Sequence, residues 1–312
     1  TSYTDHRLAV PDVTGRLAKA MGGANTTLTF AEVRNQILEF TGTLTVADNA
    51  KLTIYGIEDS DAGLFVAYNN GTSTFTQTGG EVTVYDSRVR AGRSNSSHGT
   101  ITVNGGTFTQ ALSGAHATLV NDINTYLGWD SASCTGNLNV GGTGVVTLGA
   151  DLNAGGNGTS AVTVSGNGQL IVPGAILLAQ NAGSNGSLAV SGNGVVTTGG
   201  LHQGAGSANV SFDGGTLRAG SSFGTAIPIT VNAGGATFDT NGHTLGLAGA
   251  LNGAGGVTKT GSGTLALGAE NTFAGPLAIQ AGTVRLDPLS GSSLWLDAAN
   301  AASVQTAGTV VN

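Results

Sequence analysis

The feature of this sequence that most constrains its fold is an internal repeat, in which a short apolar strand runs into a glycine turn. The strands alternate apolar with small polar residues, as Val162-Thr163-Val164-Ser165 does, which is typical of a strand with one buried face. One such unit cannot bury its apolar face alone, so successive units must stack and share a core. The turns are separated by 26, 36, 25, 26, 22 and 20 residues, and they are Gly79-Gly80, Gly105-Gly106, Gly141-Gly142, Gly166-Asn167-Gly168, Gly192-Asn193-Gly194, Gly214-Gly215 and Gly234-Gly235.

A second short strand recurs once per unit, for example Leu152-Asn153-Ala154, so two strands and two turns in about 25 residues make one coil. This pattern predicts an all-β fold, a parallel β-helix solenoid of about ten to twelve coils, and we expect the solenoid to be right-handed. A strand spacing of about 4.8 Å makes it a rod on the order of 50 Å long. A β-propeller is the alternative, but its blades need four strands in roughly 40 residues, and these units are too short for that.

Charged residues are scarce and unevenly placed along the chain. They make up 9% of the 312 residues, the net charge is −7, and no Lys or Arg occurs between Arg93 and Arg218. The chain therefore lacks the basic stripe that neutralises phosphates, which excludes nucleic acid as a partner. The middle of the rod presents hydroxyls and amides, a surface that suits neutral glycans, neighbouring copies of the chain, or no partner at all. No run of 18 apolar residues occurs, so we expect no membrane span in this segment.

The repeat pattern divides the chain into three parts. Residues 1–25 are the least repeat-like, and we expect a cap or an irregular arm there, because the open end of a solenoid has to be shielded. Residues 26–290 form the β-helix repeat domain. Residues 291–312 read as the start of a truncated following domain or as a C-terminal tail, since Ser293-Leu294-Trp295-Leu296-Asp297 resembles the opening strand of a jelly roll.

The end of the repeat region carries a denser motif. It reads Lys259-Thr260-Gly261-Ser262-Gly263-Thr264-Leu265, followed by Asn271-Thr272-Phe273-Ala274-Gly275 and then by Gly282-Thr283-Val284. This motif resembles the autotransporter-associated β-strand repeat of passenger-type β-helices. The resemblance implies an exported bacterial surface protein, and it implies that Gly261, Gly263, Gly275 and Gly282 are structural turn positions. It supplies no catalytic residues.

One dense acidic cluster, Glu58, Asp59 and Asp61, is a candidate metal site. Several carboxylate oxygens together suit Ca²⁺, and a carboxylate pair could also serve as the acid and base of a glycosidase. Because the cluster falls in a turn between strands, a solvated acidic turn explains it equally simply. No spacing of His or Cys residues suits zinc.

The 36-residue interval between turns reveals an insertion at about residues 111–124, which contains His116. Insertions in solenoids project as loops on one face and often carry binding function. Aromatic rings stack on sugars, so His116, Tyr126 and Trp129 are the candidate ligand-binding residues. The competing interpretation is that Trp129 packs beneath the loop.

A charged patch surrounds one strand of the repeat. Arg88 and Arg90 alternate with Val89, so we expect both to point outward and to pair with Asp86 or with acids on adjacent coils. Binding of an anionic glycan is the functional alternative. The single cysteine, Cys134, forms no intrachain disulfide, and we expect it to be buried.

Together these observations predict a non-catalytic structural or adhesive segment of a large exported bacterial surface protein, extracellular or at the cell surface. We expect it to act as a rigid spacer or a self-assembling unit, with other copies of itself or other cell-surface proteins as partners and glycans as an alternative ligand. No cofactor is expected, apart from the Ca²⁺ alternative at the acidic cluster. The competing function is a carbohydrate-binding or polysaccharide-degrading β-helix module.

Overall fold

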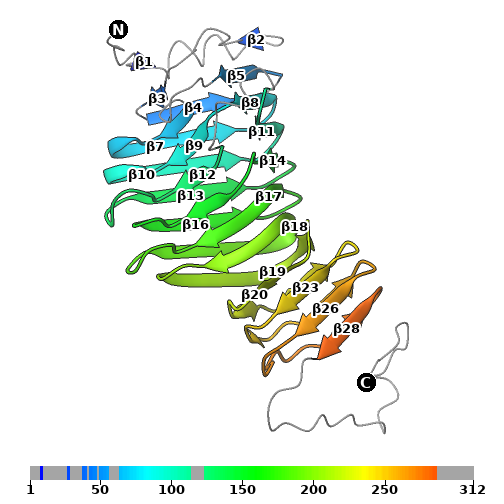
Figure 1. The fold of residues 1–312 in the computed structure, drawn as a ribbon. Helices are drawn as coiled ribbons and strands as arrows, with labels where there is room; N and C mark the ends of the chain where they lie inside the picture. The colour runs from blue at the N-terminus through cyan, green and yellow to red at the C-terminus, as the bar shows by residue number, and fades with distance from the viewer. Residues whose placement is uncertain are drawn as a thin grey trace, which may run out of the picture.

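The computed structural model describes residues 8–9, 27–28, 37–40, 42–47, 49–55, 63–113 and 123–286. These residues contain strands and turns but no helix, and nearly all the strands are stacked in parallel along one rod (Figure 1). The fold is a parallel β-helix, as the repeat predicts. Its hand stays a prediction, and so do the boundaries proposed at residues 25 and 290.

Each coil in the first two thirds of the rod contributes one strand to each of three faces. The first face is built from β4 (Gly42–Val46), β7 (Asn69–Gln77), β10 (Ser94–Val103), β13 (Thr135–Val140), β16 (Thr159–Val164), the start of β18 (Asn185–Gln203), β19 (Ser207–Ala219), β21 (Ile229–Val231) and β24 (Leu251–Asn252). The second face is built from β2 (Thr27–Leu28), β5 (Lys51–Tyr55), β8 (Glu81–Tyr85), β11 (Thr107–Ala111), β14 (Val145–Thr147), the start of β17 (Gln169–Leu178), later parts of β18 and β19, β22 (Ala236–Asp239), β25 (Val257–Thr260) and β27 (Leu277–Ile279).

The third face begins with β1 (Leu8–Ala9) and β3 (Ile37–Phe40). It continues through β6 (Gly63–Val66), β9 (Arg88–Ala91), β12 (Thr125–Leu127), β15 (Leu152–Ala154) and the ends of β17 and β18. A separate four-stranded sheet follows, made of β20 (Phe223–Thr225), β23 (Thr244–Leu247), β26 (Thr264–Leu267) and β28 (Thr283–Leu286). Figure 1 shows this sheet set aside from the strands that precede it.

The second face confirms the predicted number of coils, because eleven strands pair there in series from β2 to β27 within the described residues. The expectation of two strands per coil is wrong for this part of the rod. The missing strand is the one that directly follows each glycine turn, such as β8 or β11, each of five residues.

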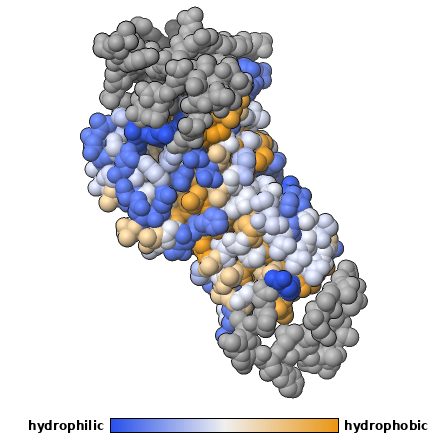
Figure 2. Space-filling model, viewed as in Figure 1, coloured by the Kyte–Doolittle hydropathy of each residue, from blue (hydrophilic) through white to orange (hydrophobic). Residues whose placement is uncertain are grey.

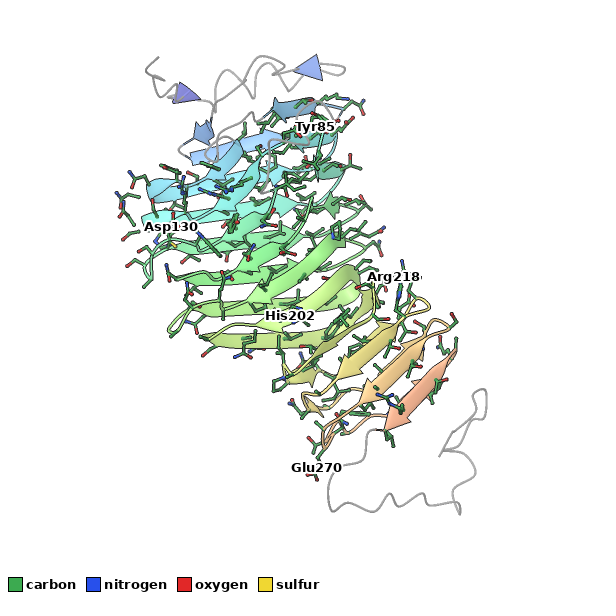
Figure 3. The ribbon with its side chains drawn as sticks, in the orientation of Figure 1. Tyr85, Asp130, His202, Arg218 and Glu270 are labelled. Carbon is green, nitrogen blue, oxygen red and sulfur yellow. The ribbon has the colours of Figure 1, made fainter. Side chains whose placement is uncertain are left out.

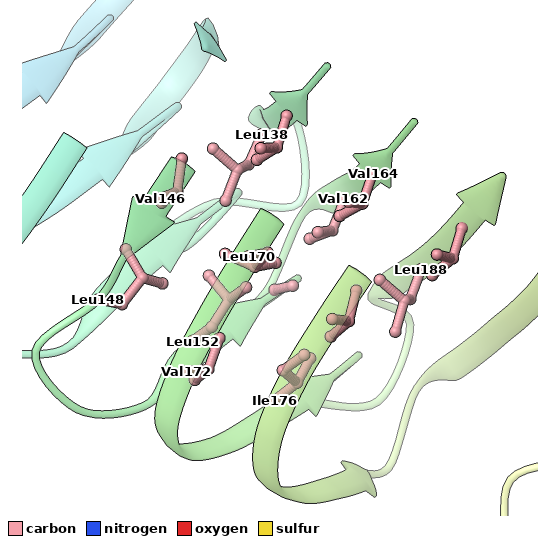
Figure 4. Close-up of a cluster of buried hydrophobic side chains, with 14 of the residues drawn as sticks. Leu138, Val146, Leu148, Leu152, Val162, Val164, Leu170, Val172, Ile176 and Leu188 are labelled. Atoms are coloured by element: carbon pink, nitrogen blue, oxygen red, sulfur yellow. The ribbon is translucent and has the colours of Figure 1, made fainter. Parts of the chain in front are cut away.

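Inward-facing residues stack in register to form one continuous core. Leu138, Val162 and Leu188 lie opposite each other on successive coils of the first face, and each is at most 2% exposed. Figure 4 shows them against the corresponding residues of the other two faces. Hydrophilic and neutral residues cover most of the rod in the view of Figure 2, with hydrophobic residues confined to a narrow band. The core follows from strand alternation, as predicted.

The turn glycines are required by close coil-to-coil spacing. Gly142 has a φ of 54°, and a Cβ there would collide with the carbonyl oxygen of Asn104 on the preceding coil. Gly192 and Gly214 instead lie opposite each other at a corner. There β18 and β19 bend and stay paired on both sides, with a shift in register after Gly192. Close approach of the kind seen at Gly142 is what a structural turn position requires, and some of the predicted turns lie inside long bent strands.

Candidate binding site on the third face

Three arginines and four aromatic rings converge on the third face where β6, β9 and β12 lie side by side. We call them the aromatic–arginine cluster, and its members are Phe65, Tyr68, Arg88, Arg90, Arg93, Tyr126 and Trp129. The register places Phe65, Arg90 and Tyr126 directly opposite each other on three successive coils.

Arg90 lies between two aromatic rings and does not project into solvent. Its guanidinium carbon is 5.1 Å from the centre of the Phe65 ring and 5.5 Å from that of Tyr126, and the residue is only 5% exposed. A cation over a ring face is attracted by the ring quadrupole, and more strongly where water is excluded. The expectation that Arg90 points outward did not include this burial, which the rings of both neighbouring coils produce.

Arg93 and Trp129 extend the cluster to the corner that follows the third face. The guanidinium carbon of Arg93 is 4.6 Å from the Tyr68 ring centre, and its Nε pairs with Oδ2 of Asp130 at 3.0 Å. The Tyr126 and Trp129 rings meet edge to face at 4.4 Å between centroids. Trp129 also lies across Gly156 of the next coil, where a Cβ would be 2.5 Å from Cε3.

Asp86 binds Ser113 and not the arginines with which it was predicted to pair. It is 3% exposed and accepts hydrogen bonds from the backbone N–H of Ser113, at 2.9 Å, and from the Ser113 hydroxyl. Oδ1 of Asn124 likewise accepts from the N–H of Asp151, and Oδ1 of Asp151 from that of Ala175. These side chains form a ladder along the corner before the third face, and it fixes both ends of the insertion.

A buried glutamine closes the base of the same insertion. Oε1 of Gln110 accepts hydrogen bonds from the Thr125 hydroxyl at 3.0 Å and from the N–H of Gly149 at 3.3 Å, and its Nε2 donates to the carbonyl oxygen of Ser87 at 2.8 Å. Gln110 therefore joins the strand before the insertion to the strand after it. No sequence signal marked this role, because glutamine at an inward position reads as a break in the apolar pattern.

The predicted ligand-binding residues are only partly brought together. Tyr126 and Trp129 touch, whereas His116 lies outside the described residues, as do Glu58, Asp59 and Asp61. The described ends of the insertion lie at the corner before β12, and Trp129 follows β12 at the opposite corner. Figure 3 shows these two corners far apart, marked by Tyr85, which pairs with Ala111 at the insertion side, and by Asp130.

Across the ranges that the structure describes, no group of three His, Cys, Asp or Glu residues is placed to hold a metal ion. Within the same ranges, no helix is long and apolar enough to cross a membrane. Cys134 is buried, as expected, and burial raises the pKa of its thiol, which donates to the carbonyl oxygen of Ser131.

The dense motif near the end of the rod is built around a buried lysine. Lys259 is 0% exposed and stands in the core column opposite Phe238. Its Nζ donates hydrogen bonds to the carbonyl oxygens of Thr260 at 2.7 Å, Gly261 at 2.8 Å and Ala281 at 2.9 Å. Burial lowers the pKa of this ammonium group, with the Asp239 carboxylate opposing the shift.

The remaining motif positions also serve the coil. Oδ1 of Asn271 accepts from the N–H of Leu251 at 2.8 Å, which joins two coils. A Cβ at Gly263 would collide with the carbonyl oxygen of His243, and one at Gly275 with the backbone of Gly256. These contacts are those expected of turn positions.

Comparison with protein families gives one match, to the passenger-associated-transport-repeat family over residues 257–286. Curated proteins and solved structures give no match. The matched residues include Lys259, Gly263 and Asn271, which make the contacts between the last coils described above. Residues 257–286 are therefore a passenger-associated transport repeat, as the resemblance indicated, and this repeat supports assignment of the chain to an exported surface protein.

Proposed function

We propose that this chain is a non-catalytic, stiff spacer within a bacterial surface protein, extracellular and attached to further segments at its ends. The observation that carries the proposal is the unbroken series of paired strands on the second face, from β2 to β27. Each coil is hydrogen-bonded to the next along its strands, so bending the rod requires breaking ladder bonds. A spacer needs this resistance and needs no turnover.

Side-chain contacts between coils support the same function. The Asn157 and Asn181 amides bond along the rod at 2.9 Å, and those of Asn167 and Asn193 at 3.0 Å. Arg218 pairs with Asp239 of the next coil at 2.7 Å. These groups add side-chain links between coils to the backbone hydrogen bonds that already join them.

Single-molecule stretching tests the spacer directly. Handles would be attached through cysteines at Thr45 and Thr260 in a Cys134→Ser background. We expect no compliance until unfolding, followed by steps of about 70–90 Å for coils of 20 to 26 residues and of about 120–130 Å for the coil that contains the insertion. Smooth extension at low force, without steps, would contradict the spacer.

A glycan-binding role is the second candidate, and the contact of Tyr126 with Trp129 favours it. Arginines beside these rings suit an acidic sugar. Retention on acidic but not neutral polysaccharides, lost in Trp129→Ala and kept in the wild type, would support this role. Release of new chain ends would point to an enzyme. If the chain is retained on neither acidic nor neutral polysaccharides, the spacer is the function that remains.

A further inference from the structure

The outward side of the first face is an array of mostly small hydroxyl and amide side chains, with one histidine and two alanines among them. From β7 to β19, outward-facing residues that lie opposite each other on six successive strands form three columns along the rod. The columns are Thr72, His98, Thr135, Thr159, Asn185 and Ser207; Thr74, Thr100, Asn137, Ala161, Ser187 and Asn209; and Thr76, Thr102, Asn139, Thr163, Ala189 and Ser211. We call this surface the hydroxyl–amide face.

None of these eighteen positions carries a carboxylate, an ammonium or a guanidinium group. The third column continues with the same residue types at both ends, through Thr45 on one side and Thr230 and Asn252 on the other. Charged pairs lie on the second face, as Lys51–Glu81 and Arg218–Asp239 do, and the exposed Asp213 of β19 borders the hydroxyl–amide face.

We propose that the hydroxyl–amide face binds the same face of a second copy of this chain. The proposal rests on the proposed function, because it names the partner of the rod and the surface that meets it. Each copy has a net charge of −7, so two copies repel each other in most orientations. Only a contact made through an uncharged face avoids bringing like charges together.

The shape of this face fits such a contact. Short side chains on a regular β-sheet let two sheets approach to about 10 Å and interdigitate, as in packed β-sheets of low charge. Asn137 and Asn139 already bond to Thr100 and Thr102 along the rod, through long hydrogen bonds of 3.4 Å. Because these side chains are partly ordered in the single chain, less conformational entropy is lost on association.

The area of the face is sufficient for a specific, reversible dimer. Strands about 4.8 Å apart and five residues wide give roughly 500 Å² over six coils and roughly 700 Å² over nine. Two copies would therefore bury about 1,000–1,400 Å², at the lower end of the range for specific complexes. A two-fold axis would let each copy use the same patch, so the contact closes as a dimer.

Sedimentation velocity of the whole chain from about 1 to 200 µM tests the proposal. The test variant is Asn139→Lys/Thr163→Lys, which places two positive charges halfway along the third column of the face. The control is Thr147→Lys/Thr197→Lys, which makes the same charge change at outward positions of the second face. We expect concentration-dependent dimers in the wild type and the control, and association at least tenfold weaker in the test variant.

The association should also not weaken as NaCl is raised from 0.05 to 0.5 M, because no ion pair contributes to it and salt screens the repulsion between the two copies. A wild type that stays monomeric, or a test variant that dimerises like the control, would overturn the proposal. So would retention on an insoluble neutral polysaccharide that only the test variant loses, which would assign the face to a glycan. Stretching of the monomeric test variant separates the two proposals: coil-sized steps keep the spacer even where the dimer fails.

Discussion

The ammonium group of Lys259 donates a hydrogen bond to the carbonyl oxygen of Ala281, one coil further along the chain, at 2.9 Å. The same group donates to two carbonyls of its own turn. A charged group in the core column is tolerated because three carbonyl acceptors surround it. This lysine is the residue through which the transport repeat ties its last two coils together.

Replacing this lysine should destabilise the rod. Lys259→Met leaves the carbonyls of Thr260, Gly261 and Ala281 without their donor, and we expect a loss of about 2–5 kcal/mol in the free energy of unfolding. The matched control is Lys51→Met, because Lys51 is 44% exposed and belongs to a surface ion pair worth about 0–1 kcal/mol. Urea unfolding followed by circular dichroism measures both, and equal losses would contradict this role.

The stability of the wild type should depend on pH through the same residue. The pKa of Lys259 is lower in the folded chain than its ordinary value of 10.5, so the unfolded chain binds more protons in the interval between the two values. Stability contributed by this group therefore rises as pH increases through that interval toward 10.5. The difference in unfolding free energy between the wild type and Lys259→Met should grow accordingly. A difference that is constant or shrinks would contradict the lowered pKa.

Adding one methyl group at Gly263 should be far more harmful than adding it elsewhere on the same sheet face. The Cβ of Gly263→Ala collides with the backbone of His243, whereas that of Gly224→Ala meets nothing closer than 3.7 Å. We expect a loss of about 1–3 kcal/mol for the first and a small change for the second. Thermal unfolding of the two variants gives the comparison, and similar melting temperatures would be the contrary result.

The base of the insertion should loosen when Gln110 is replaced. Gln110→Leu removes the hydrogen bonds to Ser87, Thr125 and Gly149, and we expect faster proteolytic cleavage between residues 113 and 123. Gln169→Leu is the control, since Gln169 is exposed on the second face. Unchanged cleavage in Gln110→Leu would show that the corner ladder alone holds the insertion.

Local pattern was enough to predict the stacked coils but not the side-chain contacts between them. Strand alternation identified the core, as at Val162 and Leu188, because inward and outward positions are set within each strand. It placed Arg90 outward as well, but it could not show that Phe65 and Tyr126 enclose it. Their contact depends on the register between coils, and the sequence pattern does not fix that register across the insertion that separates Arg90 from Tyr126.

Asp86 and Gln110 show the same limit. Both are polar residues with partners on other coils, Ser113 for Asp86 and Ser87 and Gly149 for Gln110, and neither belongs to a repeated motif. Lys259 differs, because the family motif marked its neighbourhood even though the apolar pattern gave no reason for a buried lysine. The repeat in the sequence therefore predicts the path of the backbone and the core residues. Individual polar contacts between coils can be identified only in the folded structure.

Pulsed dipolar spectroscopy between two spin labels tests the stacked rod most directly. The labels would be attached in a Cys134→Ser background on the second face, where Thr109, Thr147 and Thr260 share one outward column. Labels at Thr109 and Thr260, six coils apart, should give a narrow distribution near 29 Å, taking about 4.8 Å per coil. Moving the first label to Thr147 crosses the whole insertion, yet it should shorten the distance by only about 4.8 Å. A broad distribution, or a change that follows the sequence separation, would contradict a continuous stiff solenoid.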